Sequence, residues 1–154
     1  MQLEFCVSQE SEAADLTQVR CLSKGYWGYS PETLRSWGTA MQITPDYIRS
    51  NLVWSIYSAG LLVGFYAIQR GDEDVLDHLW LLPSVIGQGV GRAALNHALR
   101  CAAQYGIQSL RIVSDADAEG FYRRFGAEKT GEIFSPLQNR MLPLLTLAVK
   151  TPVL

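Results

Sequence analysis

Short hydrophobic runs with alternating or helical spacing cover most of the chain, and they predict its elements in order. Alternation over residues 3–8 predicts a first strand. Residues 11–24 have the pattern of a helix with Ser11 as its N-cap, because a serine followed by Glu-Ala-Ala is a typical helix start. Ser30 and Pro31 predict the start of a second helix, since serine caps helices and proline suits the first helical position.

The rest of the chain alternates β-rich runs with two further helical segments. Residues 52–57 and 61–69 predict a hairpin, because the Ser-Ala-Gly sequence between them is a turn signal. Further strands are expected at 75–82, 109–114, 128–134 and 142–150, further helices at 89–105 and 118–125, and a short helical turn after Thr44. This order of elements predicts an α/β fold with a mixed sheet, in a single domain over residues 1–154.

Composition narrows the setting and the partners. The chain has 154 residues and a net charge of −2 without a basic cluster, which argues against a nucleic-acid partner. Three scattered cysteines without a C-x-x-C pair, and no signal-peptide pattern at Met1, predict a cytoplasmic protein. The longest apolar run, 141–149, is too short to span a membrane. It has instead the pattern of an apolar edge strand, which suggests a homodimer.

Histidine and cysteine spacing gives no sign of a metal site. His78 and His97 have no ligand spacing with each other or with the cysteines, so we predict no metal. His97 falls within the helix expected at 89–105, where we expect a structural role.

A glycine-rich loop is the most informative stretch of the sequence. Gly87, Gly89 and Gly91 lie between an expected strand and an expected helix, and Arg92 follows them. Free backbone N–H groups at a helix start bind anions, and glycines let the backbone close on a phosphate. The loop therefore predicts a phosphate site, although a tight strand-to-helix turn alone would also use glycine.

Two phosphate ligands compete for this loop. Gly89-x-Gly91-x-x-Ala94 fits the dinucleotide fingerprint, and Asp115 follows at about the expected distance. Against a dinucleotide, residues 83–88 separate the fingerprint from its strand, and too little sequence follows for a doubly wound sheet. A P-loop is excluded because Gly-Lys-Ser/Thr is missing.

Two motifs resemble the GNAT superfamily of acyl-CoA-dependent N-acyltransferases. The loop Ile86-Gly-Gln-Gly-Val-Gly91 is similar to the Q/R-x-x-G-x-G/A loop of that family, with Ile86 in place of the usual Gln or Arg. The segment Asp117-Ala-Glu-Gly-Phe-Tyr122 is similar to the family's Asn-x-x-x-Phe-Tyr, with Asp117 in place of Asn. The resemblance implies a mostly antiparallel sheet of about seven strands, flanked by about four helices and splayed between the fourth and fifth strands.

The same resemblance implies acetyl-CoA as co-substrate and assigns roles to particular residues. Tyr122 would protonate or hydrogen-bond the departing thiolate. The expected coenzyme-binding residues are Trp80, Leu81, Leu82, Gly87, Gln88, Gly89, Val90, Gly91, Arg92, Asp117 and Tyr122. An aromatic cluster of Tyr26, Trp27 and Tyr29 falls where the family places its acceptor pocket, although ordinary packing between helices would explain it equally well.

The implied reaction is direct attack of an amine on the thioester, which requires removal of a proton from the amine. Asp77 and His78 are the candidate bases, and only one should reach the site because successive strand residues point to opposite faces. Both residues also have purely structural explanations. Asp77 would be a solvated strand residue, and His78 would pack or form a hydrogen bond locally. The predicted function is an N-acetyltransferase acting on a small-molecule or protein amine. The alternative is a domain that binds acyl-CoA without catalysis.

Overall fold

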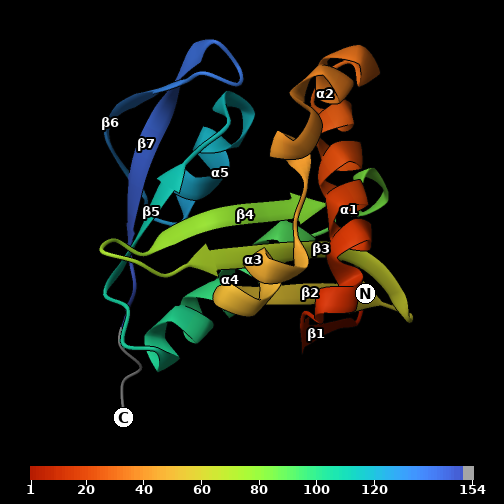
Figure 1. The fold of residues 1–154 in the computed structure, drawn as a ribbon. Coiled ribbons are helices and arrows are strands. Elements are labelled where there is room, and N and C mark those ends of the chain that lie inside the picture. The colour runs from red at the N-terminus through yellow and green to blue at the C-terminus, as the bar shows by residue number, and fades with distance from the viewer. Residues whose placement is uncertain (151–154) are drawn as a thin grey trace.

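The computed structural model describes residues 1–150, and these fold around one seven-stranded sheet (Figure 1). The strand order is β1-β2-β3-β4-β5-β7-β6, and every neighbouring pair is antiparallel except β4–β5. The strands are β1 (Leu3–Val7), β2 (Leu52–Ser58), β3 (Leu61–Gln69), β4 (Val75–Leu81), β5 (Ser109–Val113), β6 (Glu128–Ser135) and β7 (Arg140–Ala148). The sheet therefore agrees with the expected strand number and with its mostly antiparallel character.

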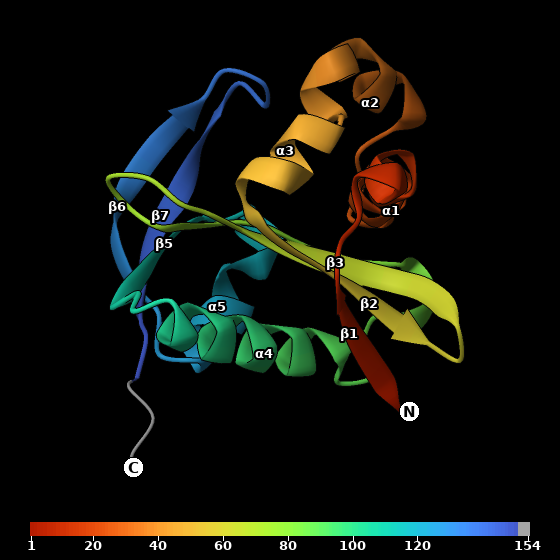
Figure 2. The same ribbon diagram turned by 60° about the horizontal axis from the view of Figure 1, so that its bottom comes forward.

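Helices cover both faces of the sheet (Figure 2). Helices α1, α2 and α3 lie over one face, and α4 and α5 lie over the other. Their bounds are α1 (Ala13–Tyr26), α2 (Pro31–Trp37), α3 (Pro45–Ser50), α4 (Val90–Gln104) and α5 (Glu119–Arg124). Leu16 of α1 is buried against Phe65 in one core cluster, and Leu95 of α4 is buried against Tyr66 in another, so the sheet separates two cores.

Local capping explains where the helices begin. The Ser30 hydroxyl accepts a hydrogen bond from the Thr33 amide, with Pro31 in the first turn, as the sequence predicted. Ser11 is not the cap of the first helical segment. Gln9 occupies that position, and its amide donates to the Glu12 carboxylate over 2.9 Å in a capping box. A one-turn 3-10 helix, Glu10–Glu12, then leads into α1.

The fourth and fifth strands separate almost as soon as they meet. Their only register pair is Val75 with Arg111, supported by a 2.9 Å hydrogen bond from the Arg111 amide to the Asp74 carbonyl. From there β4 continues alongside β3 only, while β5 continues alongside β7. The expected splay between the fourth and fifth strands is confirmed, and it opens a gap inside the sheet.

The predicted edge strand at the C-terminal end is wrong. Strand β7 lies between β5 and β6, so both of its edges are paired, and the sheet edges are β1 and β6. The sequence pattern misled because a strand that is buried on one face looks the same at an edge and in the interior. The argument for a homodimer through this segment is therefore lost, and the homodimer stays a prediction without it.

Two further features of residues 1–150 bear on the earlier predictions. No helix in this range is long and apolar enough to cross a membrane. His97 has the structural role expected of it: its Nδ1 lies 2.7 Å from the Tyr66 hydroxyl, and its ring stacks on Phe5 at 4.2 Å between centroids.

Candidate active site

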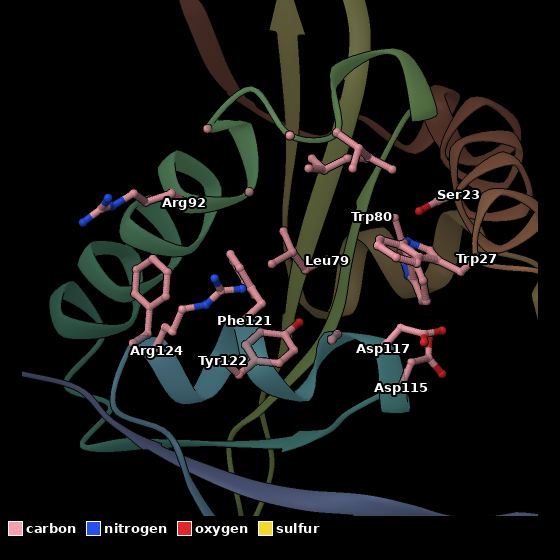
Figure 3. A pocket seen from close by; sticks show the side chains of 17 residues that line it. Ser23, Trp27, Leu79, Trp80, Arg92, Asp115, Asp117, Phe121, Tyr122 and Arg124 are labelled. Atoms are coloured by element: carbon pink, nitrogen blue, oxygen red, sulfur yellow. The ribbon is translucent and has the colours of Figure 1, made fainter.

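A cavity of about 690 Å³ occupies the gap between β4 and β5 (Figure 3). Its walls come from the end of β4, the glycine turn before α4, helix α5, and the loop that follows β5. The lining residues are Ser23, Trp27, Leu79, Trp80, Leu81, Ile86, Gly87, Gly89, Gly91, Arg92, Asp115, Asp117, Ala118, Phe121, Tyr122, Arg124 and Phe125. The cavity therefore contains most of the expected coenzyme-binding residues.

The glycine turn has the backbone geometry of an anion site. Gly87 and Gly89 have φ angles of 84° and 83°, which only glycine adopts without strain. Gly89 caps α4 without a side-chain hydrogen bond. The first helical hydrogen bond runs from the Ala93 amide to the Gly89 carbonyl. The amides of the first turn are thus free of helical partners, at the positive end of a 15-residue helix.

Side chains near this turn divide into those that border the cavity and those that do not. Val90 is buried, and the Gln88 side chain donates to the Ser84 carbonyl over 2.8 Å, so neither lines the cavity. Both remain predicted coenzyme contacts through their backbone amides only. A Cβ on Gly91 would touch the Phe121 ring at 3.5 Å, so this glycine packs closely against α5.

Arg124 is a cavity residue that sequence reasoning missed. Its side chain extends toward the middle of the cavity, whereas Arg92 points outward from α4 (Figure 3). The available signal was its position two residues after Tyr122 on the same helix. An arginine facing a helix N-terminus adds charge-assisted donors to a phosphate site.

The register of β4 decides which of its backbone groups face the gap. The Leu82 amide donates to the Val63 carbonyl over 2.8 Å, so it is used within the sheet and is not free for a ligand. Because amides alternate in direction along a strand, the Trp80 amide also points toward β3, and the Leu81 amide points into the gap. Of the three predicted backbone contacts, Leu81 is the one directed at the cavity.

Tyr122 lies at the junction between the core and the cavity. Its side chain is 7% exposed and packs with the core, while its hydroxyl end points away from α5 into the cavity (Figure 3). Burial, and then the nearby Asp115 carboxylate, raise the pKa of the Tyr122 phenol well above its usual value. The group is therefore protonated at neutral pH and can donate a hydrogen bond. Phe121 and Phe125 both pack against the core and line the cavity.

The two predicted bases lie outside the cavity lining. The Asp77 carboxylate accepts a 2.5 Å hydrogen bond from the Tyr47 hydroxyl, and the His78 Nδ1 accepts one from the Trp80 indole over 2.9 Å. Burial lowers the pKa of His78 to about 4, against the opposing effect of Asp77. His78 is therefore neutral at pH 7, and both side chains have partners inside the protein.

The predicted aromatic cluster is divided between two environments. Trp27 lines the cavity, whereas Tyr26 and Tyr29 do not. Tyr26 is exposed and packs edge-on against Trp27, with ring centroids 5.0 Å apart. Tyr29 donates its hydroxyl proton to the Gln138 side chain over 2.8 Å, which joins the α1–α2 loop to the turn between β6 and β7.

A buried lysine behind the cavity wall was also missed. The Lys24 side chain is 3% exposed, and its ammonium lies 3.4 Å from the Asp115 carboxylate. The same ammonium lies 4.7 Å, 4.9 Å and 5.5 Å from the ring centroids of Trp80, Tyr29 and Trp37. Burial lowers the pKa of Lys24, while the Asp115 carboxylate and the aromatic rings favour its charged form. The two partners are 91 positions apart, and sequence reasoning considered Asp115 only as a dinucleotide contact.

Together these groups suit a long ligand with phosphates at one end and a reactive group at the other. Free amides lie at one end of the cavity, and the Arg124 side chain and the Leu81 amide face its middle. Tyr122 and Asp115 lie farther along its wall. Within residues 1–150, no three His, Cys, Asp or Glu side chains are arranged to hold a metal ion.

Comparisons with known proteins identify the architecture. Residues 49–126, slightly more than half of the chain, match the family model described as an acetyltransferase (GNAT) domain. The structure is similar to the PaiA N-acetyltransferase of Thermoplasma acidophilum, solved with coenzyme A, with a TM-score of 0.78, 17% identity, and coverage of 96% of this chain and 99% of that one. It is also similar to a GCN5-related N-acetyltransferase of Rhodopseudomonas palustris, with a TM-score of 0.75, 18% identity, and coverage of 96% and 94%. No protein with a curated function matches the sequence.

Proposed function

Because the chain belongs to the GNAT acetyltransferase family, we propose that it transfers the acetyl group of acetyl-CoA to a primary amine of a small molecule or a protein. Because it belongs to this family, the protein is an acyl-CoA-dependent N-acetyltransferase. The proposal concerns the acceptor, the direct attack on the thioester, and the residues that perform it. The observation that carries it is that the glycine turn and the Tyr122 hydroxyl border one cavity.

The residues present fit coenzyme A. The first-turn amides of α4, behind Gly87 and Gly89, suit the pyrophosphate, and Arg124 supplies a positive charge in the same cavity. The Leu81 amide, free of a strand partner on the gap side, suits an amide of the pantetheine arm. Coenzyme A would supply an activated acetyl thioester, and the protein would hold it with its carbonyl near the exposed β4 amides.

Tyr122 would act on the sulfur side of the reaction. A tyrosine phenol has a pKa of about 10 and a free thiol one of about 8.5, so a hydrogen bond from the phenol stabilises the leaving sulfur without complete proton transfer. A raised pKa keeps the Tyr122 proton in place at neutral pH, which favours this donor role. Trp27, at the other end of the cavity, would contact the acceptor.

One observation favours a second function, an acyl-CoA-binding domain without turnover. Asp77 and His78 are engaged with Tyr47 and Trp80, and neither lines the cavity. If one of these two side chains were the only possible base, no base would reach an amine in the cavity. The protein would then bind the thioester without transferring its acetyl group.

Two measurements on the purified protein distinguish these functions. Acetyl-CoA should raise the melting temperature and NAD should not, with longer acyl-CoAs defining the acyl preference. A panel of primary amines, including peptides with free amino termini, should then release free thiol with at least one member. Stabilisation by acetyl-CoA without thiol release would support the binding domain. Stabilisation by NAD alone would contradict both.

A further inference from the structure

Asp115 is the carboxylate that shares the cavity wall with Tyr122. It lies two residues after the end of β5 and lines the cavity, where Figure 3 shows it below Trp80. Asp115 and Tyr122 line the same cavity, and after burial the Asp115 carboxylate is the second cause of the raised pKa of the Tyr122 phenol. Neither Asp77 nor His78 borders this space.

Both the backbone and the side chain of Asp115 are held in place. Its carbonyl accepts hydrogen bonds from the Ala118 amide over 3.0 Å and from the Ser114 hydroxyl over 2.7 Å. One carboxylate oxygen pairs with the Lys24 ammonium at 3.4 Å, and the other accepts a 3.0 Å hydrogen bond from the Gln138 amide. An ionised carboxylate has about four acceptor positions, so at least one remains for a ligand in the cavity.

Lys24 is the charged partner of Asp115 in a partly buried ion pair. Burial disfavours a charged carboxylate, and an ammonium within hydrogen-bond distance compensates for it. The Lys24 side chain has no route to the cavity, since it is not among the lining residues and is enclosed by Trp80, Tyr29 and Trp37. Its charge therefore acts on the acceptor through Asp115.

We propose that Asp115 is the catalytic carboxylate that takes the proton of the acceptor amine, and that Lys24 and Gln138 are the positioning residues that hold it. This inference rests on the proposed acetyl transfer. The neutral amine donates an N–H to an unoccupied acceptor position of the Asp115 carboxylate while its nitrogen bonds to the acetyl carbon. The C–S bond breaks and its electron pair stays on sulfur. The nitrogen's proton passes to Asp115 and from there to the sulfur, with the Tyr122 phenol as hydrogen-bond donor to that atom.

The experiment compares single carboxylate substitutions, using the amine identified in the thiol-release screen. Asp115→Asn should lower kcat by about 10²-fold or more, the usual contribution of a general base, without changing the stabilisation by acetyl-CoA. Asp115→Glu should recover part of the rate. Asp77→Asn tests the competing base, and Asp72→Asn, on the loop before β4, is the matched control outside the cavity.

A second variant separates positioning from folding. Gln138→Leu removes one donor to Asp115 from a half-buried turn position and should lower kcat/KM for the amine about tenfold, as loss of a hydrogen bond to a charged group does, with unchanged binding of acetyl-CoA. Lys24→Arg should keep more activity than Lys24→Met.

The outcomes are distinct for the two proposals. Full activity of Asp115→Asn, or loss in Asp77→Asn alone, would overturn the assignment of Asp115 and leave acetyl transfer intact. If the unaltered protein binds acetyl-CoA and releases no thiol with any amine, the proposed transfer itself is refuted, and this inference with it.

Discussion

The indole Nε1 of Trp80 donates a 2.9 Å hydrogen bond to the Nδ1 of His78, two residues earlier on β4. This bond places the imidazole proton on Nε2, which lies 3.5 Å from the Asp77 carboxylate. His78 is 9% exposed and packs against Phe65 and Tyr47. The Trp80–His78 pair therefore fixes a neutral histidine under the cavity wall, and protonation of His78 would break it.

The first prediction concerns acid stability. Burial lowers the His78 pKa from its ordinary 6.5 to about 4, with Arg20 and Lys24 adding to the effect and Asp77 opposing it. Between these two values the unfolded chain binds more protons than the folded one, so stability present above pH 6.5 is lost as the pH falls toward 4. The loss should be about 3 kcal/mol, measured as the free energy of unfolding in urea.

His78→Gln tests the assignment, because glutamine can accept the Trp80 hydrogen bond without titrating. The variant should lose less stability than the unaltered protein between pH 6.5 and pH 4. An identical acid response in the two proteins would show that other groups cause it.

The second prediction concerns the phenol in the cavity. Tyr122→Phe keeps the packing against Phe121 and removes only the hydroxyl donor. The kcat for amine acetylation should fall by roughly 10²-fold, while the dissociation constant of acetyl-CoA should change little. Tyr105→Phe is a matched control, because Tyr105 is exposed at the far end of α4. Unchanged turnover in Tyr122→Phe would remove the donor role.

A third prediction uses two adjacent arginines of α5. Arg124 lines the cavity, whereas Arg123 pairs with Glu119 at 3.2 Å on the exposed face. Arg124→Gln should weaken coenzyme A binding by roughly ten- to a hundredfold, since hydrogen bonds to charged groups contribute about 1.5–3 kcal/mol. Calorimetric titration should show no such change for Arg123→Gln. A pantetheine fragment without phosphates should bind the Arg124 variant and the unaltered protein equally, and a difference there would locate the arginine's effect elsewhere.

The fourth prediction concerns the contact between β3 and β4. A Cβ on Gly64 would lie 2.7 Å from both the Trp80 carbonyl oxygen and the Leu81 side chain. Gly64→Ala should therefore lower the free energy of unfolding by about 1–3 kcal/mol and weaken acetyl-CoA binding, because it displaces the cavity end of β4.

Gly25→Ala is the opposite case and serves as the control. Gly25 lies in α1, where an added Cβ meets nothing within 4 Å. Its replacement should raise the free energy of unfolding by up to about 1 kcal/mol, as alanine does in an exposed helix. Thermal or urea unfolding of both variants decides the comparison, and equal effects would contradict it.

Local patterns predicted most of the fold because each element carries its own signal. The cap at Ser30, the turn between β2 and β3, and the glycines before α4 depend on neighbours within a few positions. The position of β7 in the sheet depends on which strands flank it, and residues 140–148 carry no information about that. The edge-strand prediction failed for this reason.

The parts of the candidate site that lie within one sequence motif were predicted, and the parts assembled from distant segments were missed. The glycine turn and the Tyr122 motif are each a continuous stretch of sequence, so each could be recognised as a pattern. Both border the cavity. Lys24, Asp115 and Gln138 come from three distant segments and meet only in the folded chain. Asp77 and His78 were chosen for their residue type, and their partners Tyr47 and Trp80 could not be inferred from it.

The single register pair between Val75 and Arg111 has a consequence for how the domain could diversify. Beyond that pair, β4 presents peptide groups to the gap, and a ligand that bonds to peptide groups does not depend on the side chains of the strand. Substitutions at a cavity side chain that faces the acceptor, such as Trp27, would then alter the choice of acceptor while binding of the coenzyme arm stays the same. Main-chain groups would then bind the acetyl donor and side chains would bind the acceptor. The choice of acceptor could therefore change in evolution without a change in coenzyme binding.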